Sequence, residues 1–258
     1  MTQRLLSILL LLMPAHAVMS QEAPSPQRHV INAKMAAIGY NSVQDTYLSP
    51  ESYGGGELRY ISHTIRETEG RRWSRLIINE GYGAYGKSRS ENGATLSAAY
   101  RFQYGLMRDM GFTAGPFSLR AGVQGEFIGG FIYNTRNGNN PAQAIVSLDA
   151  GPLVHAEYSL SKVRLSYEAS CPLLGLTFSP AYGQSYYEIF ERGDYDHNVV
   201  PVTIVSMPSL RHTLTADIPF LGVTWRIGYL GDYRQQDVNH LKRHIYTSAF
   251  MVGIVVRR

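Results

Sequence analysis

The sequence is poor in cysteine, in charged residues and in long apolar runs. Its single cysteine, Cys171, rules out a disulfide within the chain. Charged residues make up 17% of the chain, below the roughly 25% of soluble domains. Beyond the N-terminal segment, no apolar run approaches the about 20 residues that a membrane-spanning helix needs. These shortages exclude a disulfide scaffold and a bundle of membrane helices, and the low charge is typical of a large lipid-facing surface.

The N-terminus has the pattern of a secretory signal peptide. Arg4 precedes an apolar run, Leu5–Met13, and Ala15-His16-Ala17 places small residues where a signal peptidase cuts. We therefore predict a signal peptide over residues 1–17, with a second possible cut after Ser20. The alternative is a buried N-terminal helix, since the run is too short to cross a bilayer.

The rest of the chain alternates apolar and polar residues over segments that end in turns. The clearest segment is 94–106, where Leu96 and Tyr100 alternate with polar residues such as Arg101. Alternation of this kind predicts β-strands with one apolar and one polar face. The 18 tyrosines of the chain are typical of proteins that place aromatic girdles at membrane interfaces.

The connections expected between these segments fall into two groups. If both termini are periplasmic, the periplasmic connections are short, namely Thr68–Arg72, Ser159–Lys162 and Pro219–Gly222, with Met107–Pro116 somewhat longer. The opposite connections are mostly longer and more polar: Asn41–Gly56, Gly86–Gly93, Asn134–Gln143, Leu174–Ser209 and Asp232–Arg243. This asymmetry is typical of outer-membrane barrels. We predict an all-β, antiparallel transmembrane β-barrel of about ten strands (eight to twelve possible) over residues 33–258, after a flexible leader at 18–32.

The polar face of the predicted strands carries five basic and five acidic residues. They are Arg101, Arg120, Glu126, Asp149, Glu157, Arg164, Glu168, Arg211, Asp217 and Arg226. An arginine that faces lipid at the bilayer midplane costs about 2–4 kcal/mol, so we expect this face to line the lumen. Side chains nearly fill a barrel of this size, which predicts a plugged or narrow lumen with a charge network. In the alternative, a soluble lipocalin-like cup, the polar face contacts water.

The connection Leu174–Ser209 is the richest candidate for binding. Long loops are usually functional or disordered, and aromatic content favours order; Val199–Ser206 also has the pattern of an additional strand. Tyrosine offers both a stacking face and a hydroxyl. The predicted binding residues at the loop and rim are Tyr182, Gln184, Tyr186, Tyr187, Asp196, His197 and Arg211. The alternative is a lid that packs only on itself.

Catalytic and metal-binding motifs are weak. Ser209 with His197 or His212 suggests a lipid hydrolase, with Asp196 and Asp217 nearby. However, His212 lies on the apolar parity of its strand, and the chain has no Gly-x-Ser-x-Gly motif. We therefore nominate no catalytic residue and favour a non-enzymatic role.

Two further features of the sequence concern a metal site and a nucleic-acid partner. His240 and His244, with Asp232 and Asp237 nearby, are four residues apart, which says little in a loop without cysteine. We expect no metal and no cofactor. The net charge of +4 comes from arginines spread singly along the chain, so we expect no nucleic-acid partner.

Several strings in the loops resemble a family of exported β-rich proteins from Bacteroides-type bacteria, known by number as domain of unknown function family 3316. The strings are Tyr133–Pro141, Ser179–Phe190, Tyr195–Asn198, Pro208–His212, Gly228–Asp232 and Val238–Lys242. The resemblance extends from about residue 39 to the end. It implies outer-membrane residence and gives no activity, substrate or catalytic residue.

Together these patterns predict an outer-membrane barrel with a plugged or narrow lumen that binds a partner through its extracellular loops. The expected partners are outer-membrane lipid and an envelope protein or glycan. Three alternatives stay open at this point: a narrow-pore transporter of small solutes, a lipid-modifying enzyme of the outer membrane and a soluble ligand-binding cup.

Overall fold

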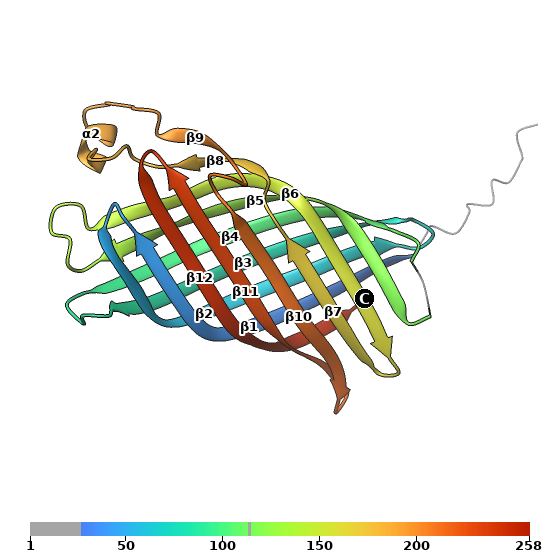
Figure 1. Ribbon diagram of the computed structural model, residues 1–258. Helices are drawn as coiled ribbons and strands as arrows, with labels where there is room; N and C mark the ends of the chain where they lie inside the picture. Colours follow the sequence, from blue (N-terminus) through green and yellow to red (C-terminus); the bar gives the residue numbers. More distant parts are fainter. Residues whose placement is uncertain (1–26, 113–114) are drawn as a thin grey trace, which may run out of the picture.

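In a computed structural model that describes residues 27–112 and 115–258, the chain forms a closed barrel (Figure 1). Ten strands form the wall: β1 (Arg28–Asp45), β2 (Ser49–Thr68), β3 (Trp73–Ser88), β4 (Ala94–Asp109), β5 (Phe117–Asn134), β6 (Ala142–Leu160), β7 (Val163–Ser170), β10 (Ser209–Phe220), β11 (Val223–Val238) and β12 (Leu241–Arg257). Neighbours along the wall pair antiparallel, and β1 pairs with β12 to close it. The predicted barrel of about ten strands is confirmed.

The predicted signal peptide lies outside the described residues. Strand β1 already begins at Arg28, so the predicted leader at 18–32 extends too far, and the barrel starts before residue 33. Within the described residues, no helix is long and apolar enough to cross a membrane. We call the end where β1 begins and β12 ends the terminal end, and the opposite end the lobe end.

The two faces of the wall differ as the alternation predicts. On β4, Tyr100 and Phe102 point outward and are exposed, whereas Arg101 and Gln103 are buried inside. This arrangement repeats around the barrel, so apolar and aromatic side chains form the outer band and polar ones face the lumen. The soluble cup is therefore wrong, because its apolar residues would have to face inward.

Four connections were expected to be longer than they are. The turns are residues 46–48 between β1 and β2, 89–93 between β3 and β4, 135–141 between β5 and β6 and 239–240 between β11 and β12. Strands β1 and β2 have 18 and 20 residues, whereas about 9–11 cross a bilayer. The ladders therefore continue beyond the membrane, where the outer face contacts water and no longer has to be apolar. Alternation fades there although the backbone pairing does not.

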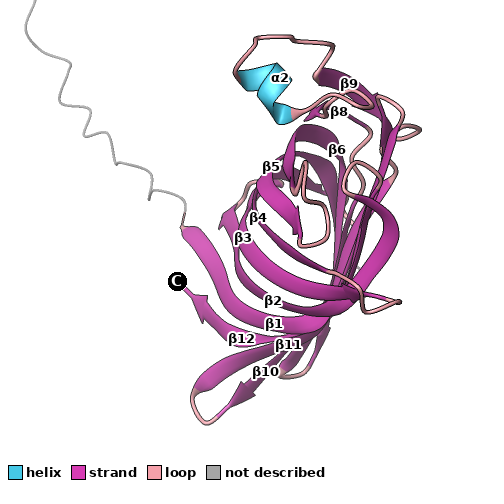
Figure 2. Ribbon diagram, turned by 90° about the vertical axis from the view of Figure 1, so that its left-hand side faces the viewer, coloured by secondary structure: helices cyan, strands magenta, loops and turns pink. Residues whose placement is uncertain are grey.

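The connection between β7 and β10 forms a small lobe at the lobe end of the barrel (Figure 2). It contains β8 (Leu174–Phe178), the helix α2 (Tyr186–Phe190) and β9 (Val199–Thr203). Strand β8 continues along β6 where β7 ends, and β9 pairs with β8. The additional strand expected over Val199–Ser206 is thus present but ends at Thr203.

Candidate functional site: the lumen and the lobe

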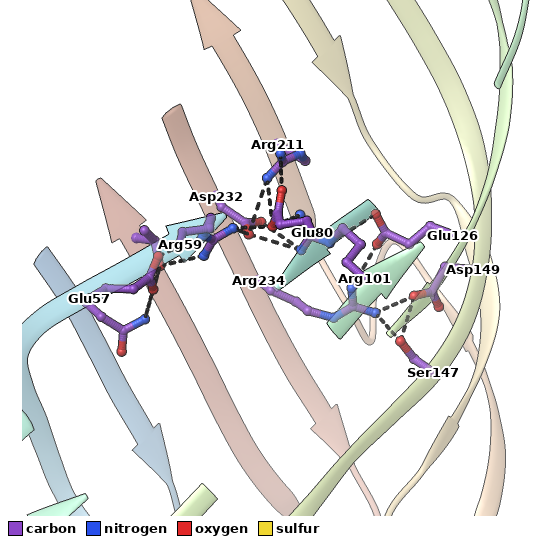
Figure 3. A network of polar contacts seen from close by, with 12 residues as sticks. Glu57, Arg59, Glu80, Arg101, Glu126, Ser147, Asp149, Arg211, Asp232 and Arg234 are labelled. Atoms are coloured by element: carbon purple, nitrogen blue, oxygen red, sulfur yellow. Dashed lines mark hydrogen bonds and ion pairs between the residues drawn. The ribbon is translucent and has the colours of Figure 1, made fainter. Parts of the chain in front are cut away.

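A network of charged side chains crosses the middle of the lumen (Figure 3). We call them the charge belt: Glu57, Arg59, Glu80, Arg101, Glu126, Asp149, Arg211, Asp232 and Arg234. They come from β2, β3, β4, β5, β6, β10 and β11. No side chain of the belt is more than 11% exposed. The belt is thus a buried ionic layer that extends across the barrel.

Arg59 is the centre of one half of the belt. Its Nε lies 2.7 Å from Glu57 Oε1, and its Nη1 lies 2.5 Å from Glu80 Oε1 and 2.9 Å from Asp232 Oδ2. Arg211 binds the other oxygen of Glu80, also at 2.5 Å. Because each charge has a direct partner of opposite sign, the layer avoids the large penalty of an unpaired buried charge.

The other half of the belt is built around Arg234. This guanidinium donates to Glu126 Oε1 at 3.0 Å and also to a carboxylate oxygen of Asp149. Arg101 joins the two halves, since its Nη2 lies 3.0 Å from Asp232 Oδ2 and its Nε lies 3.5 Å from Glu126 Oε2. The belt is therefore one connected network and not a set of separate pairs.

Apolar layers cover the belt on both sides. The layer toward the terminal end includes Met35, Ile61, Ile78, Met107, Leu153, Leu230 and Met251. The layer toward the lobe end consists of Val43, Leu48, Ala99, Ile128, Ile132 and Ile145. On β6, Ile145, Asp149 and Leu153 follow one another in the order layer, belt, layer. The lumen is plugged by its own side chains, and the belt is shielded from water at both ends.

A second ionic group lies closer to the terminal end. Glu168 Oε2 lies 3.1 Å from His63 Nε2 and 3.2 Å from His155 Nδ1, and Arg226 Nε donates to Asp217 at 2.6 Å. The two histidines and Glu168 border an enclosed cavity of about 20 Å³, enough for a water molecule. The apolar layer takes no residue from β7 or β10. The ionic group, which includes Glu168 of β7 and Asp217 of β10, fills the lumen beside these two strands.

The lobe is fixed to the barrel by Tyr186. Ser185 caps the N-terminus of α2 through a capping box with Glu188. From α2, the Tyr186 hydroxyl donates to Gln143 Oε1 at 2.6 Å and accepts from the Ala144 amide at 2.7 Å. Burial raises the pKa of Tyr186 to about 12, so the hydroxyl keeps its proton and can donate at neutral pH.

Aromatic rings strengthen this contact. The ring of Tyr186 lies 5.9 Å from Phe190 and 6.0 Å from Phe178, and the ring of Tyr47, in the β1–β2 turn, meets it edge-on at 5.9 Å. Such pairs contribute about 0.5–1.5 kcal/mol beyond the area they bury. The lobe is therefore an ordered part of the barrel.

Comparisons with known proteins place this barrel in a family. Residues 4–257 match the family described as Protein of unknown function (DUF3316). The chain belongs to this family. No curated protein matches the DUF3316 chain.

Solved structures give the DUF3316 barrel only distant likenesses. It is similar to Neisserial surface protein A (10% identity, 88% of this chain and 98% of that chain covered, TM-score 0.35). It is similar to the translocator domain of autotransporter NalP from Neisseria meningitidis (11%, 91% and 90%, 0.35). It is also similar to Ail, the attachment invasion locus protein of Yersinia pestis (9%, 87% and 99%, 0.26). The barrel assignment rests on the strand pairing and not on these likenesses.

The structure places all ten sequence-predicted lumen residues of the DUF3316 barrel on the inner face. Arg101, Glu126, Asp149 and Arg211 belong to the charge belt. The other six pair nearer the terminal end: Arg120 with Glu67, Arg164 with Glu157, Glu168 with two histidines, and Asp217 with Arg226. Five belt residues were missed, namely Glu57, Arg59, Glu80, Asp232 and Arg234. Two of them, Asp232 and Arg234, were placed in a loop, although the parity of β11 continues through them.

The predicted binding residues separate into three groups. Tyr182, Tyr187, Asp196 and His197 are exposed on the lobe. Gln184 and Tyr186 are structural, since Gln184 bonds to Ala181, Asp194 and Asn198 within the lobe. Arg211 was wrongly placed at the rim, because the strand turns it into the charge belt. Phe190 and Tyr195, which were not among the predicted residues, are also exposed on the lobe; their exposure depends on how the lobe folds.

The residues considered for catalysis are dispersed. Ser209 Oγ donates to the Met207 carbonyl, and the ring of His212 lies on the outer face, about 6 Å from the rings of Tyr229 and Tyr233. Asp217 pairs with Arg226. Each of these side chains contacts other groups, so no Ser–His pair is assembled in the part of the chain that the structure describes.

The residues considered for a metal are also separated. His244 stacks on Tyr246 with ring centroids 4.7 Å apart, Asp232 belongs to the charge belt, and Asp237 pairs with Lys242. Among residues 27–112 and 115–258, no group of three or more histidine, cysteine, aspartate or glutamate residues is placed to hold a metal ion.

Proposed function

We propose that this protein is a non-conducting outer-membrane barrel that holds the lobe outside the cell as a docking surface for another envelope protein. The observation that carries the proposal is the set of aromatic rings exposed on the lobe: Tyr182, Tyr187, Phe190 and Tyr195, each at least 61% exposed. Exposed aromatic clusters of this kind mark interaction sites, and tyrosine and arginine dominate the binding energy of protein interfaces.

The chemistry of the lobe favours a protein as the partner. Arg192 lies over the ring of Tyr187 at 5.6 Å, which places a positive charge beside an exposed aromatic ring. Val199 and Val205 add exposed apolar side chains. Aromatic, arginine and apolar groups together suit a protein interface, and Tyr186 holds the surface in place so that little ordering is needed on binding.

The location is part of the same proposal. The apolar outer band and the Trp73 and Trp225 side chains exposed near the terminal end support insertion in an outer membrane. We also infer that residues 1–17 are the signal peptide that directs export, and that the protein comes from a bacterium of the Bacteroidetes type. Sequencing the N-terminus of protein from the outer-membrane fraction should give Val18, or Gln21 with the alternative cut. Recovery from the periplasmic fraction without detergent contradicts the location.

The test of the docking surface is photo-crosslinking in intact cells. A photoreactive amino acid at position 195 should trap one discrete envelope protein, and the Tyr187→Ser/Phe190→Ser double variant should reduce that product at least tenfold. Phe112→Ser is the matched control, because Phe112 is also exposed but lies at the terminal end. Binding of purified protein to a glycan array, with no crosslinked protein in cells, would replace the proposed protein partner by a glycan.

A further inference from the structure

Two arginines lie directly opposite each other on the outer face of the barrel, near the terminal end. Arg66 of β2 pairs in register with Arg75 of β3. Both side chains are exposed, whereas Ile65 and Leu76 beside them point into the lumen. Like charges in directly opposed positions destabilise a strand pair. Folding alone therefore gives no reason for this arrangement.

These arginines belong to a larger basic surface that surrounds a hollow. We call it the basic rim hollow; its lining includes Arg28, Arg66, Arg71 and Arg75 together with Trp73 and Leu106. Arg108 flanks it, in register with Trp73 on the next strand. Positive charge and an aromatic ring thus meet at one place on four neighbouring strands.

The positive charge of the hollow is not neutralised within the part of the chain that the structure describes. None of its four arginines forms an ion pair there with a carboxylate. Glu67 also lines the hollow, but its carboxylate pairs with Arg120 at 2.6 Å. Four guanidinium groups thus border the hollow against one carboxylate that already has a partner.

The position of the hollow indicates which anion would fill it. Trp73 opens β3, and arginine side chains near the end of a membrane strand extend toward the headgroups. On β4, Leu106 lies directly opposite Arg75. The next outward-facing pair on the membrane side is Ile77 with Tyr104. A ligand held here has its charge at headgroup level and apolar chains against the barrel wall.

We propose that the basic rim hollow binds the phosphate of an anionic diacyl phospholipid, of the phosphatidylglycerol class, in the periplasmic leaflet. Guanidinium groups bind phosphate oxygens in a bidentate manner. A zwitterionic lipid brings its own ammonium group, which these arginines repel. This inference rests on the proposed membrane residence and orientation, but it does not depend on the lobe having a partner.

The chain contains two tryptophans, which makes the hollow directly observable. In a Trp225→Phe variant, the remaining fluorescence comes from Trp73 inside the hollow. The variant is reconstituted in phosphatidylcholine vesicles that contain increasing fractions of brominated phosphatidylglycerol or brominated phosphatidylcholine, which quench a nearby indole. We expect association at least threefold stronger for phosphatidylglycerol, with the preference falling as salt is raised.

Variants in the same background localise the effect. Arg66→Gln/Arg75→Gln should bring the preference to about onefold, and Lys87→Gln/Arg89→Gln, which removes two exposed charges near the lobe end, should keep it. Equal quenching by the two lipids, or equal loss in both double variants, overturns the proposal. Loss of the preference on adding free inorganic phosphate also overturns it, in favour of a soluble phosphate ligand. A heat-modifiable gel shift, recorded for every sample, separates failure of membrane insertion from absence of lipid preference.

Discussion

Arg59 of β2 is a single buried side chain that connects β2 with β3 and β11. It contacts Glu57, Glu80 and Asp232, and its guanidinium lies 4.7 Å from the centre of the Tyr82 ring. Its side chain is 1% exposed. Without this residue, three carboxylates remain close together in a water-poor layer, with Arg101 and Arg211 as their remaining cations.

Replacing Arg59 by methionine is therefore expected to lower the free energy of unfolding by about 3–5 kcal/mol, the usual cost of breaking a buried ion pair from one side. Urea unfolding of protein folded in lipid vesicles measures this. Arg136→Met is the control, because Arg136 pairs with Glu51 at an exposed site, where such pairs contribute about 0–1 kcal/mol. Equal losses in the two variants would contradict a special role for the belt.

Gly151 lies where β6 changes its pairing partner from β7 to β8. A Cβ atom at this position would lie 2.1 Å from the Cys171 carbonyl oxygen, between the end of β7 and the start of β8. Gly151→Ala should therefore destabilise the protein by about 1–3 kcal/mol, as measured by the same unfolding experiment. Gly138→Ala should be nearly neutral, since a Cβ there meets nothing within 4 Å.

At the scale of the elements, the Tyr186 hydroxyl is one of the contacts that hold α2 of the lobe against the barrel. The Tyr186 hydroxyl bridges Gln143 and the Ala144 amide, and Ile189 on the same helix is buried beneath the lobe. Since an unsatisfied buried partner costs about 1–3 kcal/mol, Tyr186→Phe should release α2 from the barrel. The methyl NMR signal of Ile189 should then broaden or shift, whereas Tyr182→Phe, at an exposed position, should leave it unchanged.

The same contact should depend on pH in a defined direction. Burial raises the pKa of Tyr186 to about 12 from its ordinary value of 10, so between these values the docked lobe holds a proton that the released lobe loses. Docking should be constant below pH 10 and weaken as pH rises from 10 to 12. Following the Ile189 methyl signal across that range checks this. A signal that does not change up to pH 12 contradicts it.

The elements also show what the sequence can and cannot predict. Within the membrane, lipid forces the outer residues to be apolar, so segments such as 94–106 are found from alternation alone. Outside the membrane this requirement ends, which is why the parts of β1, β2, β11 and β12 near the lobe end were expected to be loops. The partners of Arg59 and Arg234 could not be predicted for a different reason. Most of them lie on other strands, and closure of the barrel, not local sequence, brings them together.

At the scale of the whole molecule, the lumen is closed by three successive layers, apolar, charged and apolar. Breaking one layer should not open a path, because the other two remain. Wild-type protein and an Arg234→Ala variant should both be silent in planar bilayers after insertion is verified, although the variant should unfold at lower urea concentration. Steady single-channel currents in the wild type would restore the narrow-pore transporter.

The charge belt also bears on how the protein is assembled. Asp232 and Arg234 belong to the last hairpin of the chain, yet their partners Arg59, Arg101, Glu126 and Asp149 lie on strands made much earlier. Until that hairpin is inserted, Arg59, Arg101 and Glu126 each lack one of their partners, and Asp149 lacks the arginine that binds it. The belt is therefore fully paired only once the last hairpin is in place, which favours closure of the barrel between β12 and β1.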